Sequence, residues 1–337
     1  MITKTMGDVT SVASQDSPPY ILSGEELPED VLFDPAALIK ELSGTPKRIS
    51  PIYQYDDRGS ALFERLCREP SYYLTRTERA IINKVAAALP GLIGSCILAE
   101  LGAGSGEKTR PMLAEFSRTY GQITYIPIDI SKSILIKNAA ILSQEIQSVS
   151  VNGFVGTFSA GLGHISRLDG RKCVLFLGST IGNMEDSEVS ALLALTRDAL
   201  SPQDHFLVGA DLDKDSHIME AAYNNQTVIL ANLNIMHHLN RRFDGNFDLF
   251  GFRHIAFHNT NASRMEAHLE ATEDHEVTLA RLGFSFALQQ GERILTNISR
   301  KFIPGELVEY VEKQGFRSVH TWFDQDRYCA LFLFRRL

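Results

Sequence analysis

The segment that decides the fold is Cys96–Arg110, CILAELGAGSGEKTR. Its first four residues are apolar and predict a short buried strand. An acid, Glu100, follows, and then a loop with glycine at every second position, Gly102, Gly104 and Gly106. Glycine is required where the backbone adopts positive φ or where a ligand must approach it without a Cβ in between. Because a helical pattern begins directly after the loop, the segment predicts a strand, loop and helix that bind a nucleotide-like ligand.

The spacing of the glycines narrows the choice of ligand. G-x-G-x-G behind an acid differs from the G-x-G-x-x-G of dinucleotide-binding proteins. Glu100 would repel a diphosphate but would tolerate the amino group and the sulfonium of S-adenosylmethionine (SAM). Asp129 ends the next apolar strand, 23 residues beyond Gly106, near the offset of about 20 residues at which an acid binds ribose hydroxyls. We therefore expect Glu100, Gly104, Gly106 and Asp129 to form a SAM site. The alternatives are a glycine-rich turn without a ligand and an NAD-dependent oxidoreductase. The glycine spacing and Glu100 argue against the oxidoreductase.

The chain on either side of this segment alternates between apolar strands and helices. Such alternation predicts a mostly parallel α/β sheet with helices on both faces. Ligands of these sheets bind at the carboxyl ends of the strands. Phe158 is therefore placed to line an adenine, with a plain core phenylalanine as the alternative, and the loop Gly178–Asn183 is placed to face the reactive end of the cofactor. The predicted strands are 96–99, 123–129, 149–154, 172–177 and 204–210, with a terminal hairpin of 318–323 and 328–334.

Other parts of the chain depart from this alternation. Residues 1–23 are rich in Ser, Thr, Asp and Pro and predict a disordered tail. Thr75–Glu78 has the form of a capping box that opens a helix at 76–89. Residues 214–300 give helices through 218–240 and strands near 253–258, 263–271, 278–284 and 292–302. This block interrupts the sheet before it is complete and predicts a substrate-binding domain.

Composition excludes several classes of function. The 337 residues carry a formal net charge of −8, which argues against a nucleic-acid partner because its phosphates would be repelled. No apolar run approaches the length of about 18 residues that a membrane span requires, and the N-terminus lacks a signal-peptide pattern. We therefore expect a cytoplasmic monomer that does not bind membranes. His254 and His258 are four residues apart, but in a strand this spacing separates them, so no metal site is expected.

The chain resembles the ergothioneine-pathway L-histidine Nα-methyltransferase family over nearly all of its length after residue 45. The resemblance implies an α/β fold with a Rossmann-type SAM-dependent methyltransferase domain at 77–213 and 301–337. It also implies a second, discontinuous substrate-binding domain at 24–76 and 214–300. The matching stretches are YDDRGSALFERL (55–66), PSYYLTRTE (70–78), ELGAGSGEKTR (100–110), FLGSTIGN (176–183), ADLDKD (210–215), FDLFGFRHIA (247–256) and NISRKF (297–302).

The same resemblance implies roles for individual residues. SAM would contact Gly102, Lys108, Asp129, Phe158 and Gly178. The amino-acid substrate would contact Tyr72, Asn183, Tyr223 and Ser299, and Tyr55 would lie beside its amine as the catalytic residue.

Three positions depart from the family pattern. Thr157 replaces an aspartate whose carboxylate contacts the adenine amino group, and we expect its hydroxyl to accept that hydrogen bond more weakly. In the substrate pocket, Ala267 replaces a methionine, and Asn297 replaces a glutamate that binds the imidazole. A wider pocket with a neutral amide suits an indole or a phenol better than an imidazole.

We therefore expect SAM-dependent methylation of the α-nitrogen of a free amino acid of the tryptophan or tyrosine type. Asn183 and Tyr223 would supply neutral donors to its carboxylate. Methyl transfer from a sulfonium requires alignment of the reactants rather than a metal. The alternatives are histidine as the substrate and a catalytically silent SAM-binding protein.

Overall fold

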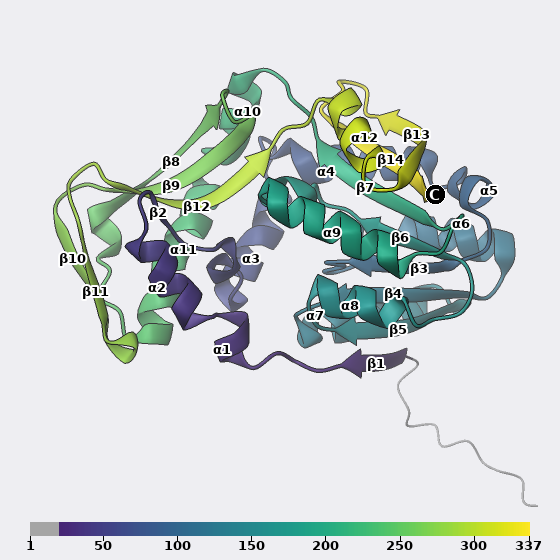
Figure 1. Cartoon of the computed structure of the whole chain (residues 1–337), viewed down its shortest axis with the longest axis horizontal. Helices are drawn as coiled ribbons and strands as arrows, with labels where there is room; N and C mark the ends of the chain where they lie inside the picture. Colours follow the sequence, from purple (N-terminus) through teal and green to yellow (C-terminus); the bar gives the residue numbers. More distant parts are fainter. Residues whose placement is uncertain (1–19) are drawn as a thin grey trace, which may run out of the picture.

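The computed structural model describes residues 20–337, which form two lobes (Figure 1). The larger lobe contains an eight-stranded sheet of order β1-β5-β4-β3-β6-β7-β14-β13. All neighbouring strands are parallel except β14, which is antiparallel to both β7 and β13. The α/β Rossmann-type prediction, including the closing hairpin, is confirmed. The strands are β1 (Tyr20–Gly24), β3 (Ile97–Leu101), β4 (Ile123–Asp129), β5 (Val149–Val155), β6 (Lys172–Phe176), β7 (His205–Asp211), β13 (Phe316–Phe323) and β14 (Cys329–Arg336).

Helices cover both faces of this sheet because its strands are apolar on both sides. On one face Leu98, Leu175 and Leu207 pack against α4 (Tyr73–Val85), α5 (Leu89–Ile93), α6 (Arg110–Tyr120) and α7 (Lys132–Glu145). On the other face Val174 and Phe206 pack against α8 (Phe158–Ile165), α9 (Asp186–Ala199) and α12 (Pro304–Glu312). This packing fixes the carboxyl ends of the parallel strands along one edge.

The smaller lobe is built on a four-stranded sheet of order β2-β12-β9-β8. Its core joins this sheet to helices from two distant parts of the sequence, α2 and α11, through buried residues such as Leu38, Leu239 and Leu269. The sheet strands are β2 (Lys47–Arg48), β8 (Phe252–Asn259), β9 (Arg264–Ala271) and β12 (Arg293–Arg300); the helices are α1 (Glu29–Leu32), α2 (Pro35–Ser43), α3 (Asp57–Leu66), α10 (Ser216–Tyr223) and α11 (Gln226–Phe243). Short 3-10 turns are η1 (Pro51–Gln54), η2 (Thr180–Asn183), η3 (Leu249–Gly251) and η4 (Ala280–Leu282).

Three local predictions were wrong. The last residues of the predicted disordered tail form β1, which pairs in parallel with β5; residues 1–19 lie outside the described part. The strand predicted at 278–284 is a turn, η4, between β10 (His275–Leu279) and β11 (Phe284–Leu288). The predicted capping box does not form, because α4 begins earlier, at Tyr73, and has no side-chain cap.

Within residues 20–337, no helix is long and apolar enough to cross a membrane.

Candidate functional site

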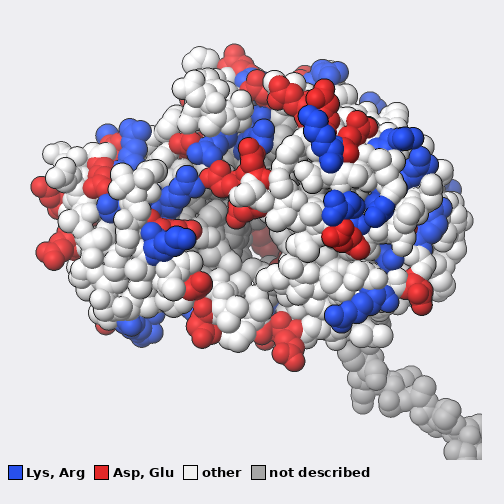
Figure 2. Space-filling model, viewed as in Figure 1, with Lys and Arg blue, Asp and Glu red and all other residues white. Residues whose placement is uncertain are grey.

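A cavity of ≈ 250 Å³ lies where the two lobes meet, and the space-filling view shows a hollow between them (Figure 2). Both lobes contribute to its wall. It brings together every residue predicted to bind or activate the amino acid, along with two predicted cofactor residues, Lys108 and Gly178. The predicted substrate residues in the wall are Tyr55, Tyr72, Asn183, Tyr223, Ala267, Asn297 and Ser299.

The predicted cofactor loop follows β3 at the carboxyl edge of the sheet. Gly102, Gly104 and Gly106 all have positive φ, at 68°, 52° and 65°. A Cβ on Gly106 would lie 2.4 Å from the side chain of Asn138, so a larger residue is excluded there. A Cβ on Gly104 would meet no atom within 4 Å, so this side of the loop is open. The loop therefore has the shape of a cradle whose open side can receive a ligand.

Asp129 ends the neighbouring strand β4 and holds this loop in place. Its Oδ2 accepts a hydrogen bond from the Gly104 amide at 3.0 Å, and its Oδ1 accepts one from the Ser131 amide at 3.0 Å. Each carboxylate oxygen has a second lone pair. Asp129 is therefore joined to the glycine loop and retains acceptor capacity for two ribose hydroxyls.

Glu100, Thr157 and Phe158 surround this cradle in different ways. The Glu100 carboxylate is 2% exposed and accepts hydrogen bonds from the hydroxyls of Thr109, at 2.6 Å, and Tyr125, so it supports the loop from beneath. Burial raises the pKa of Glu100 to about 7. The Thr157 hydroxyl is the N-cap of α8 and accepts from the Ala160 amide at 3.2 Å. Phe158 is partly buried and lies edge-on to Phe176, at 5.5 Å between ring centroids; its ring borders the cradle, 3.6 Å from where a Cβ on Gly102 would lie.

Glu78 is a site residue that the sequence analysis missed. Its carboxylate is 2% exposed and accepts hydrogen bonds from the Gly178 amide at 2.7 Å and from Lys108 Nζ at 2.7 Å. All three residues line the cavity. The T-x-x-E spacing concealed this role because it fitted a capping box.

Asn183 and Asn297, which were predicted to act on opposite ends of the substrate, contact each other. Asn183 Nδ2 donates to Asn297 Oδ1 and to the Ile298 carbonyl, both at 3.1 Å. Asn297 lies directly opposite Ala267 in the β12–β9 ladder, after an irregularity in the register between Leu295 and Asn297. Such irregularities redirect side chains. The two pocket positions that depart from the family pattern, Ala267 and Asn297, are therefore neighbours in the cavity wall.

Three tyrosines line the cavity. Tyr223 and Tyr72 meet edge to face, with ring centroids 6.3 Å apart, and Tyr223 donates to Ser299 Oγ at 2.7 Å. Tyr55 is 49% exposed, and its ring lines the open cavity. Desolvation of the hydroxyls raises the pKa of both Tyr55 and Tyr72. The hydroxyls of Tyr55 and Tyr72 therefore stay protonated at neutral pH.

The loop that carries Tyr55 is anchored to α11. The next residue, Asp56, caps α3 by accepting from the Gly59 amide at 2.8 Å, and it also accepts from Asn234 and Arg241, both at 2.8 Å. These bonds fix the backbone beside the cavity.

One buried acceptor in the cavity wall has no partner. Asn232 is 1% exposed, and its Nδ2 donates to His254 Nδ1 at 2.8 Å and to the His268 carbonyl at 3.1 Å. Its Oδ1 has no hydrogen-bond partner among the described residues. An unpaired buried acceptor is costly, so this amide lacks one hydrogen bond that a partner could supply. Within residues 20–337, no group of three or more His, Cys, Asp or Glu side chains is arranged to bind a metal ion.

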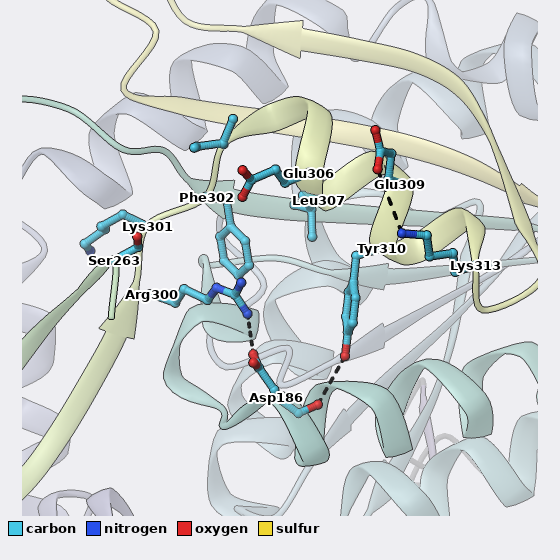
Figure 3. A pocket seen from close by; sticks show the side chains of 11 residues that line it. Asp186, Ser263, Arg300, Lys301, Phe302, Glu306, Leu307, Glu309, Tyr310 and Lys313 are labelled. Carbon is cyan, nitrogen blue, oxygen red and sulfur yellow. Dashed lines mark hydrogen bonds and ion pairs between the residues drawn. The ribbon is translucent and has the colours of Figure 1, made fainter. Parts of the chain in front are cut away.

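A second cavity, of ≈ 330 Å³, lies between α12, the end of β12 and the start of α9 (Figure 3). Four of its charged side chains pair with each other: Arg300 binds Asp186, and Lys313 lies 3.9 Å from Glu309. It contains no residue predicted to bind substrate or cofactor. The cavity between the lobes, rather than this one, is therefore the candidate active site.

Comparison with known proteins agrees with this geometry. Residues 34–336 match the model of a family described as histidine-specific methyltransferase, SAM-dependent. The chain belongs to this family. A histidine N-alpha-methyltransferase of Mycolicibacterium smegmatis is 35% identical over 84% of this chain and 88% of its own length. An L-tryptophan methyltransferase of Psilocybe serbica is 28% identical over 78% and 80%. Among solved structures, the CcbJ methyltransferase from Streptomyces caelestis is 15% identical over 76% and 90%, with a TM-score of 0.41.

The resemblance seen in the sequence is thus confirmed, and the protein is a SAM-dependent N-methyltransferase. SAM supplies an activated methyl group bonded to a sulfonium. The open cradle at Gly104 and the acceptor capacity of Asp129 fit its adenosyl part. Because relatives of this chain include both a histidine N-alpha-methyltransferase and an L-tryptophan methyltransferase, membership alone leaves the amino acid open.

Proposed function

We propose that the enzyme transfers a methyl group from SAM to the α-nitrogen of a free aromatic amino acid of the tryptophan or tyrosine type. The observation that carries this proposal is the cross-strand pair of Ala267 and Asn297 in the cavity wall. A small residue and a neutral amide replace the methionine and glutamate of the family pattern. Loss of the carboxylate removes a charge-assisted hydrogen bond to an imidazole, while loss of the methionine leaves room for a larger ring.

Asn232 supports the same class of substrate. Its unpartnered Oδ1 can accept a hydrogen bond from an indole N–H or a phenol O–H. A purely aliphatic side chain would leave this buried acceptor unsatisfied, which costs about 1–3 kcal/mol.

The tyrosines are proposed to orient the reactants. Because the Tyr55 hydroxyl stays protonated, it is proposed to accept a hydrogen bond from the amine and direct the nitrogen lone pair, rather than to remove a proton. The ammonium form of the substrate must lose its proton before attack. Transfer is then an in-line displacement, in which the N–C bond forms as the C–S bond breaks, and alignment of the two supplies much of the rate enhancement.

Histidine is the second candidate, favoured by the 35% identity to the Mycolicibacterium smegmatis enzyme. Incubating the protein with methyl-labelled SAM and a pool of the common amino acids tests both candidates. Mass spectrometry should show a labelled aromatic amino acid whose fragmentation places the methyl on the α-nitrogen. Label on a ring or side-chain atom would contradict the proposal, and no labelled product would favour a silent SAM-binding protein.

A further inference from the structure

A buried ionic cluster lies directly behind the Tyr223 and Ser299 wall of the active-site cavity. Lys301, whose side chain is 0% exposed, and Lys214 share the single carboxylate of Asp211, each at 2.6 Å. Lys301 borders the cavity of Figure 3, yet its side chain points away from Arg300 and Tyr310 there. Burial alone would lower the pKa of Lys301, but Asp211 outweighs this effect and raises it. Lys301 is therefore a permanent buried cation.

Lys301 also contacts two hydroxyls of the cavity wall. Its Nζ donates to Tyr223 Oη at 3.1 Å and to Ser299 Oγ at 2.9 Å. An ammonium group has only donors, so both hydroxyls act as acceptors toward it. Their own protons are then directed elsewhere. The Tyr223 proton goes to Ser299 at 2.7 Å, and no described residue accepts the Ser299 proton.

This arrangement favours an anion at the wall. When a carboxylate approaches, the protons of Tyr223 and Ser299 can both turn toward it, while the Lys301 bonds remain in place. With both lysines protonated, two ammonium groups around one carboxylate carry a formal charge of +1. The positive charge lies one hydrogen bond behind the wall, in a region where burial weakens screening.

Asn183 cannot bind the carboxylate in place of Tyr223 and Ser299 without rearrangement, because both of its N–H groups are bonded to Asn297 and Ile298. Lys108, the lysine that lines the cavity itself, is paired with Glu78 at 2.7 Å.

We propose that Lys301 is a positioning residue for the α-carboxylate of the substrate. Its charge gives a positive electrostatic potential at the hydroxyls of Tyr223 and Ser299, and these hydroxyls bind the carboxylate. This inference rests on the proposed function, since it assumes a free amino acid in the cavity. Lys301 does not touch the substrate; it acts through the two hydroxyls.

The test compares Lys301→Met with the matched control Lys214→Met. Both remove one ammonium group from Asp211, but Lys214 bonds to the Tyr73 hydroxyl and the Leu212 carbonyl instead of the cavity wall. Each variant is assayed with the amino acid that the wild type accepts and with its primary carboxamide. The altered basicity of the amide's α-amine affects all variants equally, so it cancels in the comparison of kcat/KM ratios.

For Lys301→Met we expect the acid-to-amide ratio of kcat/KM to fall about tenfold or more, through KM of the acid, as expected for a lost charge-assisted contact. Lys214→Met lowers the charge of the cluster by the same unit but removes no bond to the cavity wall, so its ratio should fall by less and stay within about threefold of wild type. Equal losses for acid and amide in Lys301→Met, or an unchanged ratio, would overturn the inference. A wild type that methylates the amide as well as the acid would instead contradict the proposed function.

Lys301→Gln keeps a donor but removes the charge, and it replaces Lys301→Met if that variant does not fold. Thermal melts and SAM calorimetry check folding in every case. Tyr223→Phe and Ser299→Ala provide an independent measurement in the presence of Lys301. Each should lower the acid-to-amide ratio, and no change in either would also overturn the inference.

Discussion

The paired substitution Ala267→Met with Asn297→Glu should move the enzyme's preference from an aromatic amino acid toward histidine. Both positions face each other across the β9–β12 ladder and line the same cavity. A glutamate at 297 can still accept from Asn183 Nδ2, which lies 3.1 Å from the present Asn297 oxygen. The change therefore adds a charge without removing the partner that orients the side chain.

The expected change in the kcat/KM ratio follows from the hydrogen bond that residue 297 makes to the substrate and from the volume of residue 267. A hydrogen bond to a charged group contributes about 1.5–3 kcal/mol and a neutral one about 0.5–1.5 kcal/mol, so an imidazole gains on the order of 1–1.5 kcal/mol, or roughly tenfold. A methionine in a cavity of ≈ 250 Å³ competes with an indole for space, and such overpacking costs about 1–3 kcal/mol. Together the two changes should shift the ratio of kcat/KM for histidine over tryptophan by about thirtyfold or more.

Steady-state kinetics with histidine and tryptophan, for the wild type and the variant, measures this shift. Ala267→Met with Asn297→Gln is the control, because glutamine matches glutamate in length but lacks the charge. It should reproduce the loss of tryptophan activity without the gain for histidine. If the glutamate variant leaves the ratio unchanged, Ala267 and Asn297 do not determine the side chain that is bound.

Three further outcomes are expected. Asp129→Ala should weaken SAM binding by tenfold or more in calorimetry, because it removes the ribose acceptor and the 3.0 Å bond to Gly104, each worth about 1.5–3 kcal/mol; unchanged affinity would mean that the cofactor lies elsewhere. Thr157→Asp should tighten SAM binding by about fivefold. One carboxylate oxygen can cap α8 at the Ala160 amide while the other accepts a hydrogen bond from the adenine amino group. Thr157→Ser should change SAM affinity little. The pKa of Glu100 is raised to about 7 in the folded protein, so the folded state binds this proton more tightly than the unfolded state. The resulting stabilisation is fully present below a pH of about 4.5 and is lost as the pH rises through 7. In thermal melts, Glu100→Gln should therefore gain stability relative to wild type between pH 5.5 and 8, and a constant difference would refute this assignment.

The local patterns of the sequence predicted most of the large sheet. The apolar run before Gly102 and the alternation of strands and helices are short-range signals, and the packing on both faces of the sheet reinforces them. Strand β1 was missed because its short Tyr20–Gly24 segment is a strand only through its pairing with β5, far along the chain. Helix α4 begins at Tyr73 because tertiary packing overrode a plausible cap.

The residues of the site were easier to predict than their partners. Motif resemblance named the residues that line the cavity, but it did not indicate that Asn183 bonds to Asn297, 114 positions away. Nor did it indicate that Lys301 bonds to Asp211, 90 positions away. The Asn183–Asn297 pairing depends on how the two lobes meet, and neither pairing has a local signature in the sequence. Lys301 and Asp211 both lie in stretches that match the family, at the ends of predicted buried strands. A charged residue is rarely buried without a partner, and this rule could have indicated that the two residues pair.

The proposed preference for an aromatic amino acid is measured by kcat/KM of the wild-type enzyme for tryptophan, tyrosine and histidine under identical SAM concentrations. With Asn297 in place of a glutamate, we expect histidine to be at least about tenfold poorer than the better aromatic substrate. Histidine as the best of the three would contradict the account, because it would show that other groups in the cavity restore imidazole binding.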